Sequence, residues 1–311
     1  MFIHKPILLD PVLTFLAGQQ EEVLLVDATL GEGGHAEAFL SSNPRLVLVG
    51  IERDRQIIDR ARERLDRFGR RARLFRMDFL EFFSSVAELV DRSPQCIFFD
   101  LGVSMFHYQA SGRGFSFRRS EPLDMRLDSE KDETAAQLIA TSSEEELKSL
   151  IRRFGEERFA AAISAAIVAE RKKGAIEDSQ ALARIVWNAV PPAYRHGRIH
   201  PATRTFQALR IAVNGELDLL EATLPLAFDS LSVGGRMGVI SFHSLEDRIV
   251  KRFFQERNKS CTCPSESPIC QCGGQRRARI LTRKPIFAAE AEIRANPASR
   301  SARFRILEKI V

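Results

Sequence analysis

Long apolar runs are absent from this sequence of 311 residues, and none approaches the ~20 consecutive residues that a transmembrane helix needs. The N-terminal residues lack the charged, apolar and small-residue sections of a signal peptide, so we expect a cytoplasmic protein. No internal repeat is visible. With 44% hydrophobic and 28% charged residues, the composition is typical of an ordinary soluble protein, neither disordered nor membrane-spanning.

Cysteine is also scarce, with five residues in the chain. Cys96 lies in an apolar segment and is expected to be a small core residue. The other four form two C-x-C pairs in a loop rich in Pro, Gly and Ser, namely Cys261, Cys263, Cys270 and Cys272. Four thiols can hold zinc, but C-x-C is a less typical spacing than C-x-x-C. A reduced cytosolic loop is therefore the default prediction, and no metal is predicted.

Positive charge is unevenly distributed along the chain, whose net charge is +5. Residues 257–311 carry twelve Lys and Arg against four Glu, a balance of +8, so the remainder has a balance of −3. A body near neutrality with a strongly basic tail indicates a polyanionic partner, of which nucleic acid is the commonest. The alternative is a solvated tail that is basic for solubility.

Strands and helices alternate through the first hundred residues. Strands are expected at 22–26, 46–51, 73–75 and 95–99, with helices at 36–42, 56–68 and 80–90 between them. The second strand is entirely apolar, which is typical of a strand in a buried parallel sheet. This alternation predicts a doubly wound α/β sheet whose ligand lies across the carboxyl ends of the strands.

A glycine-rich segment, residues 26–35, joins the first strand to the first helix. Glycines at such a junction let the backbone approach a ligand closely and adopt positive φ, and the helix start offers free N–H groups. A tight βα turn without any ligand is the other interpretation of this segment.

Acidic and aromatic residues follow the next strands. Glu52 stands 21 positions after Gly31, near the ~20 expected for a carboxylate that accepts hydrogen bonds from ribose, and Asp54 is equally placed. Phe79 can offer an apolar face to an adenine ring. Together these strand ends indicate an adenosine pocket.

Two adenosine cofactors fit this pocket. Gly31-x-Gly33-x-x-Ala36 formally matches the dinucleotide pattern, so a nicotinamide enzyme has to be considered. Against it, the fourth strand leads into Asp100-Leu-Gly-Val-Ser104, a segment typical of a substrate-facing loop with an acceptor carboxylate.

The alternation stops after Ser104 and resumes about a hundred residues later. Residues 105–126 are expected to be loop. Four helices follow, at 133–140, after the capping box Ser143-x-x-Glu146, at 156–173 and at 179–190. Residues 194–204 form a basic stretch that is either a nucleic-acid contact or an exposed linker. We therefore predict a discontinuous sheet domain, 1–110 with 205–311, and an all-helical substrate-recognition insertion, 111–204.

The sheet domain resumes with a long amphipathic helix at 205–231 and a strand at 236–241. Ser244 is the expected cap of the next helix, with Asp247 as its partner. Late edge strands are expected at 280–286 and 303–310.

At this level of detail the chain resembles the bacterial ribosomal RNA small subunit methyltransferase H family. The matching stretches are residues 4–9, 27–35, 100–104, 113–117, 122–126, 202–210, 213–217, 241–248, 283–286 and 296–301. The resemblance implies a Rossmann-like class I methyltransferase fold with S-adenosylmethionine as cofactor. It also implies methylation of the exocyclic N4 of a cytidine in small-subunit ribosomal RNA, within the assembled subunit. No membrane partner is implied, and the sequence leaves open whether the protein is a homodimer.

Residue by residue, the resemblance implies cofactor contacts at Gly33, Gly34, His35, Asp54, Phe79, Asp100 and His107. Asp100 and Ser104 are the expected catalytic residues. The chain departs from the family pattern at Glu52, Asp78, Met105 and His107, where Asp, Asn, Ser and often Gln are usual. His243 is either a proton acceptor or a capping or core histidine. Two other functions stay open: a nicotinamide oxidoreductase, and a non-catalytic RNA-binding or assembly factor.

Overall fold

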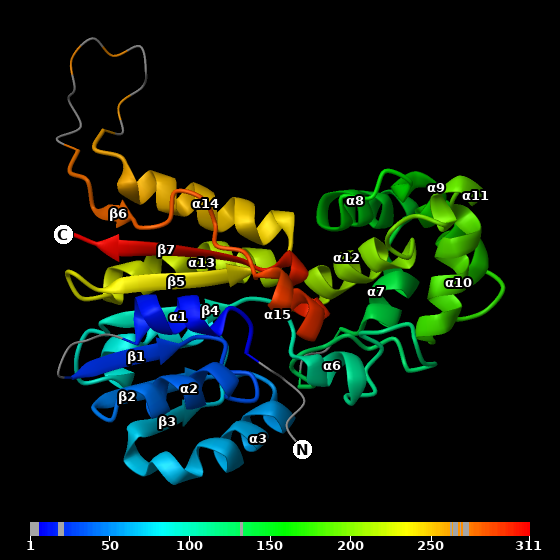
Figure 1. The fold of residues 1–311 in the computed structure, drawn as a ribbon. Helices are drawn as coiled ribbons and strands as arrows, with labels where there is room; N and C mark the ends of the chain where they lie inside the picture. The colour runs from blue at the N-terminus through cyan, green and yellow to red at the C-terminus, as the bar shows by residue number, and fades with distance from the viewer. Residues whose placement is uncertain are drawn as a thin grey trace. The chain divides into compact units, whose positions relative to one another are not determined.

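The structure is a computed structural model that describes residues 6–17, 22–130, 133–261, 263, 267, 269 and 274–311. It contains two compact units (Figure 1). The sheet unit comprises Met1–Val103 and Leu217–Val311, and the helical unit comprises Ser104–Glu216. In the described part of the chain, no helix is long and apolar enough to cross a membrane.

The sheet unit is built on one seven-stranded sheet with the order β3-β2-β1-β4-β5-β7-β6. The strands are β1 Val23–Asp27, β2 Leu46–Ile51, β3 Ala72–Phe75, β4 Cys96–Asp100, β5 Arg236–Ser241, β6 Ala278–Ile280 and β7 Arg303–Lys309. The first five in sequence run parallel, and β7 is antiparallel to both of its neighbours. The strand order reverses between β1 and β4, which confirms the predicted doubly wound α/β sheet.

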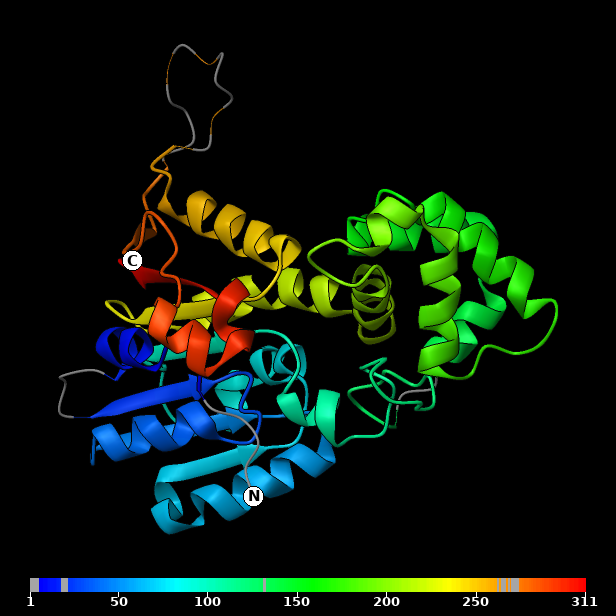
Figure 2. The same ribbon diagram turned by 45° about the vertical axis from the view of Figure 1, so that its right-hand side comes forward.

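Both faces of this sheet are covered, and successive strand residues point to opposite faces. In β1, Leu24 and Val26 belong to one buried cluster, and Val23 and Leu25 belong to the other. Cys96 is buried in the second cluster, as expected. Helix α14 runs beside β6 and β7 in both views (Figure 1, Figure 2). The helices of this unit are α1 Leu9–Leu16, α2 Gly34–Ser42, α3 Arg55–Leu65, η1 Asp66–Arg71, α4 Phe79–Ser84, α5 Val86–Leu89, α13 Glu216–Ser230, α14 Ser244–Asn258, α15 Glu290–Ala295 and η2 Pro297–Ser301.

The helical unit has no strand among its described residues. Its helices are α6 Met105–Gln109, α7 Ala135–Thr141, α8 Glu144–Gly155, α9 Ala160–Arg171, α10 Ser179–Ala189, α11 Pro192–Arg195 and α12 Ala202–Asn214. The capping box predicted at the start of α8 is present, with Ser143 and Glu146 exchanging hydrogen bonds. Helices α8 and α12 cross closely at Gly155, where a Cβ would lie 2.6 Å from the carbonyl oxygen of Arg204.

Several expected elements differ from the structure. The long helix expected at 205–231 is two helices, because Gly215 adopts the left-handed conformation, φ 61°, and ends α12. The strand expected at 280–286 is shorter and earlier, β6, with Ile286 forming only an isolated bridge to Phe304. The segment 105–126, expected to be loop, contains α6. This helix has only five residues, too few to show a helical repeat of apolar residues. Cys270 and Cys272 lie outside the described residues, so the expectation of a reduced loop without metal stays a prediction.

Candidate active site

The carboxyl ends of β3, β2, β1 and β4 lie at one edge of the sheet, because these strands are parallel neighbours. The reversal of strand order beside β1 is where open α/β sheets bind ligands. Four predicted contacts of the sheet unit follow these strands: Gly33 follows β1, Asp54 follows β2, Phe79 follows β3 and Asp100 ends β4. The structure therefore brings them to one edge.

The glycine turn after β1 has the backbone conformation that only glycine adopts without strain. Gly31 and Gly33 have φ of +54° and +78°, and Gly33 is the N-cap of α2. A Cβ on Gly31 would meet nothing closer than 4.0 Å, so this glycine borders open space. A Cβ on Gly33 would lie 3.3 Å from Leu65, so the second glycine packs against α3. The turn thus leaves room for a ligand at Gly31.

Glu52 holds this turn from the neighbouring strand end. Its two carboxylate oxygens accept hydrogen bonds from the backbone N–H of Gly31, at 3.1 Å, and of Asp54, at 2.8 Å. Asp54 is buried and caps α3 by accepting from the N–H of Gln56 at 2.8 Å. The longer carboxylate at position 52 therefore links the glycine turn to the turn that carries Asp54.

Asp100 is the centre of a buried polar group. Its backbone N–H donates to the hydroxyl of Thr29, and its Oδ2 lies 3.4 Å from Nδ1 of His35. The other ring nitrogen of His35 lies 2.9 Å from the carbonyl oxygen of Ile7, so Nε2 carries the proton that this acceptor requires. Oδ1 of Asp100 is buried and has no hydrogen-bond partner among the described residues. An unsatisfied buried acceptor of this kind is where a donor group of a ligand is expected.

Burial makes these carboxyl groups unusually hard to ionise. Desolvation raises the pKa of Asp27 to about 7, with a smaller contribution from Glu52, and desolvation raises the pKa of Glu52 to about 7 as well. Burial also raises the pKa of Asp100 well above its usual value, and the nearby carboxylates of Asp27 and Glu246 add to the effect. A cationic ligand would favour the ionised form of these carboxyl groups.

The acidic character of the site distinguishes the two adenosine cofactors. A pyrophosphate needs free backbone N–H groups and positive charge at the glycine turn. Here the N–H of Gly31 already donates to Glu52, and the buried carboxyl groups around the turn supply no positive charge. S-adenosylmethionine carries a sulfonium and an ammonium, which fit the open space at Gly31 and the unpaired oxygen of Asp100.

Phe79 begins α4 and is half-buried. Its ring packs edge-on against Phe99 of β4, with centroids 5.9 Å apart. This contact holds the ring against β4.

Two predicted site residues belong to the helical unit. Ser104 caps α6, and its hydroxyl accepts a hydrogen bond from the N–H of Phe106 at 3.2 Å. His107 is buried on the same helix, with its ring 4.9 Å from that of Phe115.

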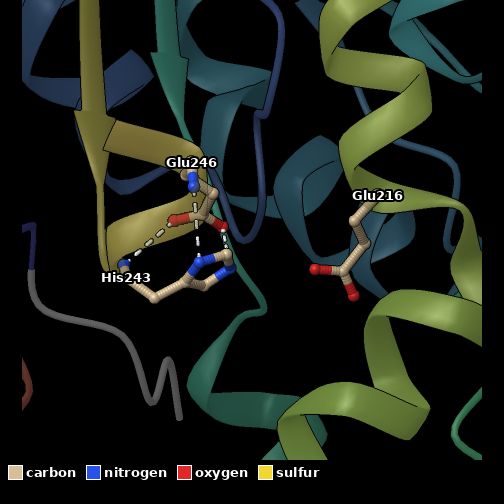
Figure 3. Close-up of side chains that lie close together, drawn as sticks. All are labelled: Glu216, His243 and Glu246. Atoms are coloured by element: carbon tan, nitrogen blue, oxygen red, sulfur yellow. Dashed lines mark hydrogen bonds and ion pairs between the residues drawn. The ribbon is translucent and has the colours of Figure 1, made fainter. Parts of the chain in front are cut away.

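His243 is the N-cap of α14, so the expectation of Ser244 as cap with Asp247 as partner is wrong by one residue. Nδ1 of His243 accepts from the N–H of Glu246, and the Glu246 carboxylate accepts from the N–H of His243 (Figure 3). Its Nε2 lies 3.0 Å from Oε1 of Glu246. Asp247 instead forms a two-point ion pair with Arg305, at 2.7 and 3.1 Å. Of the two roles considered for His243, the structure shows the capping one.

Sequence reasoning assigned no role to Asp27 and Thr29. Asp27 ends a fully buried strand, and its Oδ1 accepts from the N–H of Thr29. Thr29 in turn fixes the backbone at Asp100. The available signal was an aspartate that closes an otherwise apolar run, since such a residue needs a partner when it is buried.

Comparison with known proteins agrees with this geometry. The model of the MraW methylase family matches residues 1–310. The chain belongs to this family. A protein of Treponema denticola named ribosomal RNA small subunit methyltransferase H is 51% identical over 308 residues, which cover 99% of this chain and 98% of that protein. Proteins of the same name from Pelobacter propionicus and Citrifermentans bemidjiense are 45% and 46% identical, each over 99% of both chains.

Membership in a methylase family confirms the resemblance inferred from the motifs, and with it the prediction of an S-adenosylmethionine-dependent methyltransferase. It excludes the nicotinamide interpretation of the glycine pattern. The reversal of strand order provides a ligand site in this methylase, and the buried carboxyl groups at the strand ends suit a cationic cofactor.

Proposed function

We propose that this methylase transfers a methyl group from S-adenosylmethionine to the exocyclic N4 of a cytidine in small-subunit ribosomal RNA. The observation that carries the proposal is the unpaired, buried Oδ1 of Asp100 in an acid-rich site at the reversal point of the sheet. The names of the relatives supply the RNA class, and the family resemblance supplies the position on the base.

The proposed cofactor site comprises Gly33, Gly34, His35, Asp54, Phe79, Asp100 and His107. Asp100 is assigned to the ammonium of the cofactor, because its Oδ1 accepts no hydrogen bond from the described residues. Phe79 provides an apolar face for the adenine ring, and the buried Asp54 is the ribose candidate after β2.

The bound cofactor supplies a methyl group on a sulfonium, which is already strongly electrophilic. The protein must therefore activate the nucleophile, which is weak because the N4 lone pair of cytosine is delocalised into the ring. Acceptors that hold the N4 protons favour localisation of that lone pair, and positioning adds the correct alignment. We assign this acceptor role to Ser104 or, as the alternative to its contact with the cofactor ammonium, to Asp100.

The target base must leave its stack to be methylated, which costs a few kcal/mol. Contacts between basic side chains and phosphates can offset this cost. We propose the assembled small subunit as the substrate, because the family resemblance implies it. Sedimentation of the purified protein would establish whether it acts as a homodimer.

Tritium transfer from labelled S-adenosylmethionine to small ribosomal subunits tests the function. Subunits from cells that lack the protein should accept label, and subunits from cells that contain it should not. Digestion of the labelled RNA should then yield N4-methylcytidine. Folded protein that binds S-adenosylhomocysteine and yet labels neither subunits nor naked RNA would contradict the proposal and favour a non-catalytic RNA-binding role.

A further inference from the structure

A basic pocket of about 460 Å³ lies on the sheet unit, beside α14 and β6 and away from the strand ends described above. Three stretches of the chain that are distant in sequence contribute to it. Its lining residues are Lys251, Phe254, Gln255, Asn258, Arg276, Arg279, Ile280, Thr282, Arg283 and Arg305. Five of these ten are cationic and none is acidic.

Only part of this positive charge is neutralised. Arg305 is buried and forms the two-point ion pair with Asp247. Arg279 pairs with Glu308 at 2.6 Å, and Arg276 donates to the neutral side chain of Asn258. Toward the residues that the structure describes, the exposed side chains of Lys251 and Arg283 make no hydrogen bond or ion pair. The pocket therefore keeps an excess of three positive charges.

We propose that this pocket binds a phosphodiester group of the ribosomal RNA substrate. Phosphate is the ligand that a cluster of Arg and Lys recognises, because guanidinium and ammonium groups donate charge-assisted hydrogen bonds to its oxygens. A volume of about 460 Å³ falls in the range of ~300–1,000 Å³ of small-ligand sites, enough for a phosphate with its ribose. Phe254 and Ile280 supply apolar wall for the sugar.

The position of the pocket suits a substrate that extends from the strand ends. Strand β6 is three places from β4 in the sheet, about 14 Å at ~4.8 Å per strand. Stacked nucleotides advance about 3.4 Å each along a strand, so roughly four nucleotides cover this separation across the strands, and the offset of β6 along the strands adds to that number. The pocket also gives the basic C-terminal region a specific place to act. This inference rests on the proposed function, since the phosphate is assigned to the same RNA.

The double variant Lys251→Gln/Arg283→Gln tests the proposal. It removes two exposed positive charges that pair with none of the described residues, so the fold is expected to stay intact. The matched control is Arg294→Gln/Arg300→Gln, which removes two exposed charges from the same C-terminal region outside the pocket. Binding of each protein to unmethylated small ribosomal subunits is measured over a range of salt concentrations, together with S-adenosylhomocysteine affinity and thermal stability.

We expect the pocket variant to bind the subunit about tenfold more weakly near 0.1 M salt, and the slope of log K against log salt to fall by roughly 1 to 1.5. KM for the subunit should rise while kcat and S-adenosylhomocysteine affinity stay unchanged. The control should resemble the wild type. Equal subunit affinity and equal salt slopes for the two double variants would overturn the proposal. If the wild type binds subunits but does not methylate them, the proposed function fails, and the binding comparison still decides the pocket.

Discussion

Replacing Asp100 by Asn should separate the two effects of its carboxylate. The amide keeps the shape, and its NH₂ can donate to Nδ1 of His35, whose Nε2 donates to the carbonyl of Ile7. The hydrogen bond from the backbone N–H to Thr29 is not affected. What is lost is the negative charge on the side chain whose Oδ1 has no hydrogen-bond partner in the described part of the chain.

Hydrogen bonds to charged groups contribute about 1.5–3 kcal/mol, so the Kd for S-adenosylhomocysteine should rise roughly 10- to 150-fold. The stability of the ligand-free protein, in contrast, should not fall. Burial and the carboxylates of Asp27 and Glu246 disfavour the charge of Asp100, and they raise its pKa. A raised carboxyl pKa means that stability is lost as pH rises above the ordinary value near 4. The variant avoids this loss, so its melting temperature at neutral pH should equal or exceed that of the wild type.

Titration calorimetry with S-adenosylhomocysteine and scanning calorimetry of the ligand-free protein measure the two effects. The exposed Asp91, changed to Asn, is the matched control and should alter neither quantity. An unchanged Kd in the Asp100→Asn variant would refute the assignment of this carboxylate to the cofactor. Weaker binding that accompanies a large drop in melting temperature would show instead that the residue is structural.

Three further predictions concern other residues. Burial raises the pKa of Asp27 to about 7, so the wild type loses stability between pH ~4 and ~7 as this group ionises. The unfolding free energy of Asp27→Asn relative to wild type should therefore increase over this interval, by roughly 4 kcal/mol at most. A pH-independent difference in denaturant titrations would contradict this. Gly31→Ala and Gly234→Ala both place a side chain at positive φ and should each cost about 1 kcal/mol in thermal unfolding, but only the Gly31 variant should lose S-adenosylhomocysteine affinity, by about tenfold. Asn214→Ala leaves the N–H of Leu127 and the carbonyl of Met125 unpaired, and chemical denaturation should show a loss of about 2–5 kcal/mol.

Local sequence signals located most of the sheet unit. The apolar run at β2 and the strand at β5 were predicted at the residues where the structure has them, because a strand buried on both faces is an uninterrupted hydrophobic segment. The acidic and glycine residues at the strand ends were found for a related reason. A polar residue directly after such a run lies where the strand leaves the sheet, at its carboxyl end.

Other features depend on contacts between distant segments, which no local pattern contains. Gly215 divides a long amphipathic pattern into two helices, although the same pattern is compatible with one. His243 caps α14 because Glu246, and not Asp247, lies three residues after it, while Asp247 has a distant partner in Arg305. The cofactor contacts themselves stay a prediction that ligand binding must test.

The pairing of β4 with β5 has a consequence for biosynthesis. The two strands are neighbours in the sheet, although about 135 residues separate Asp100 from Arg236 along the chain. At 5–20 residues per second, the ribosome needs roughly 7–27 s to make that interval. During this time the side of β4 that faces away from β1 has no strand to pair with, and its sequence, Cys-Ile-Phe-Phe-Asp, is strongly apolar. Nascent chains of this length therefore expose an unpaired, apolar strand edge that is prone to aggregation, and we expect chaperones to bind them.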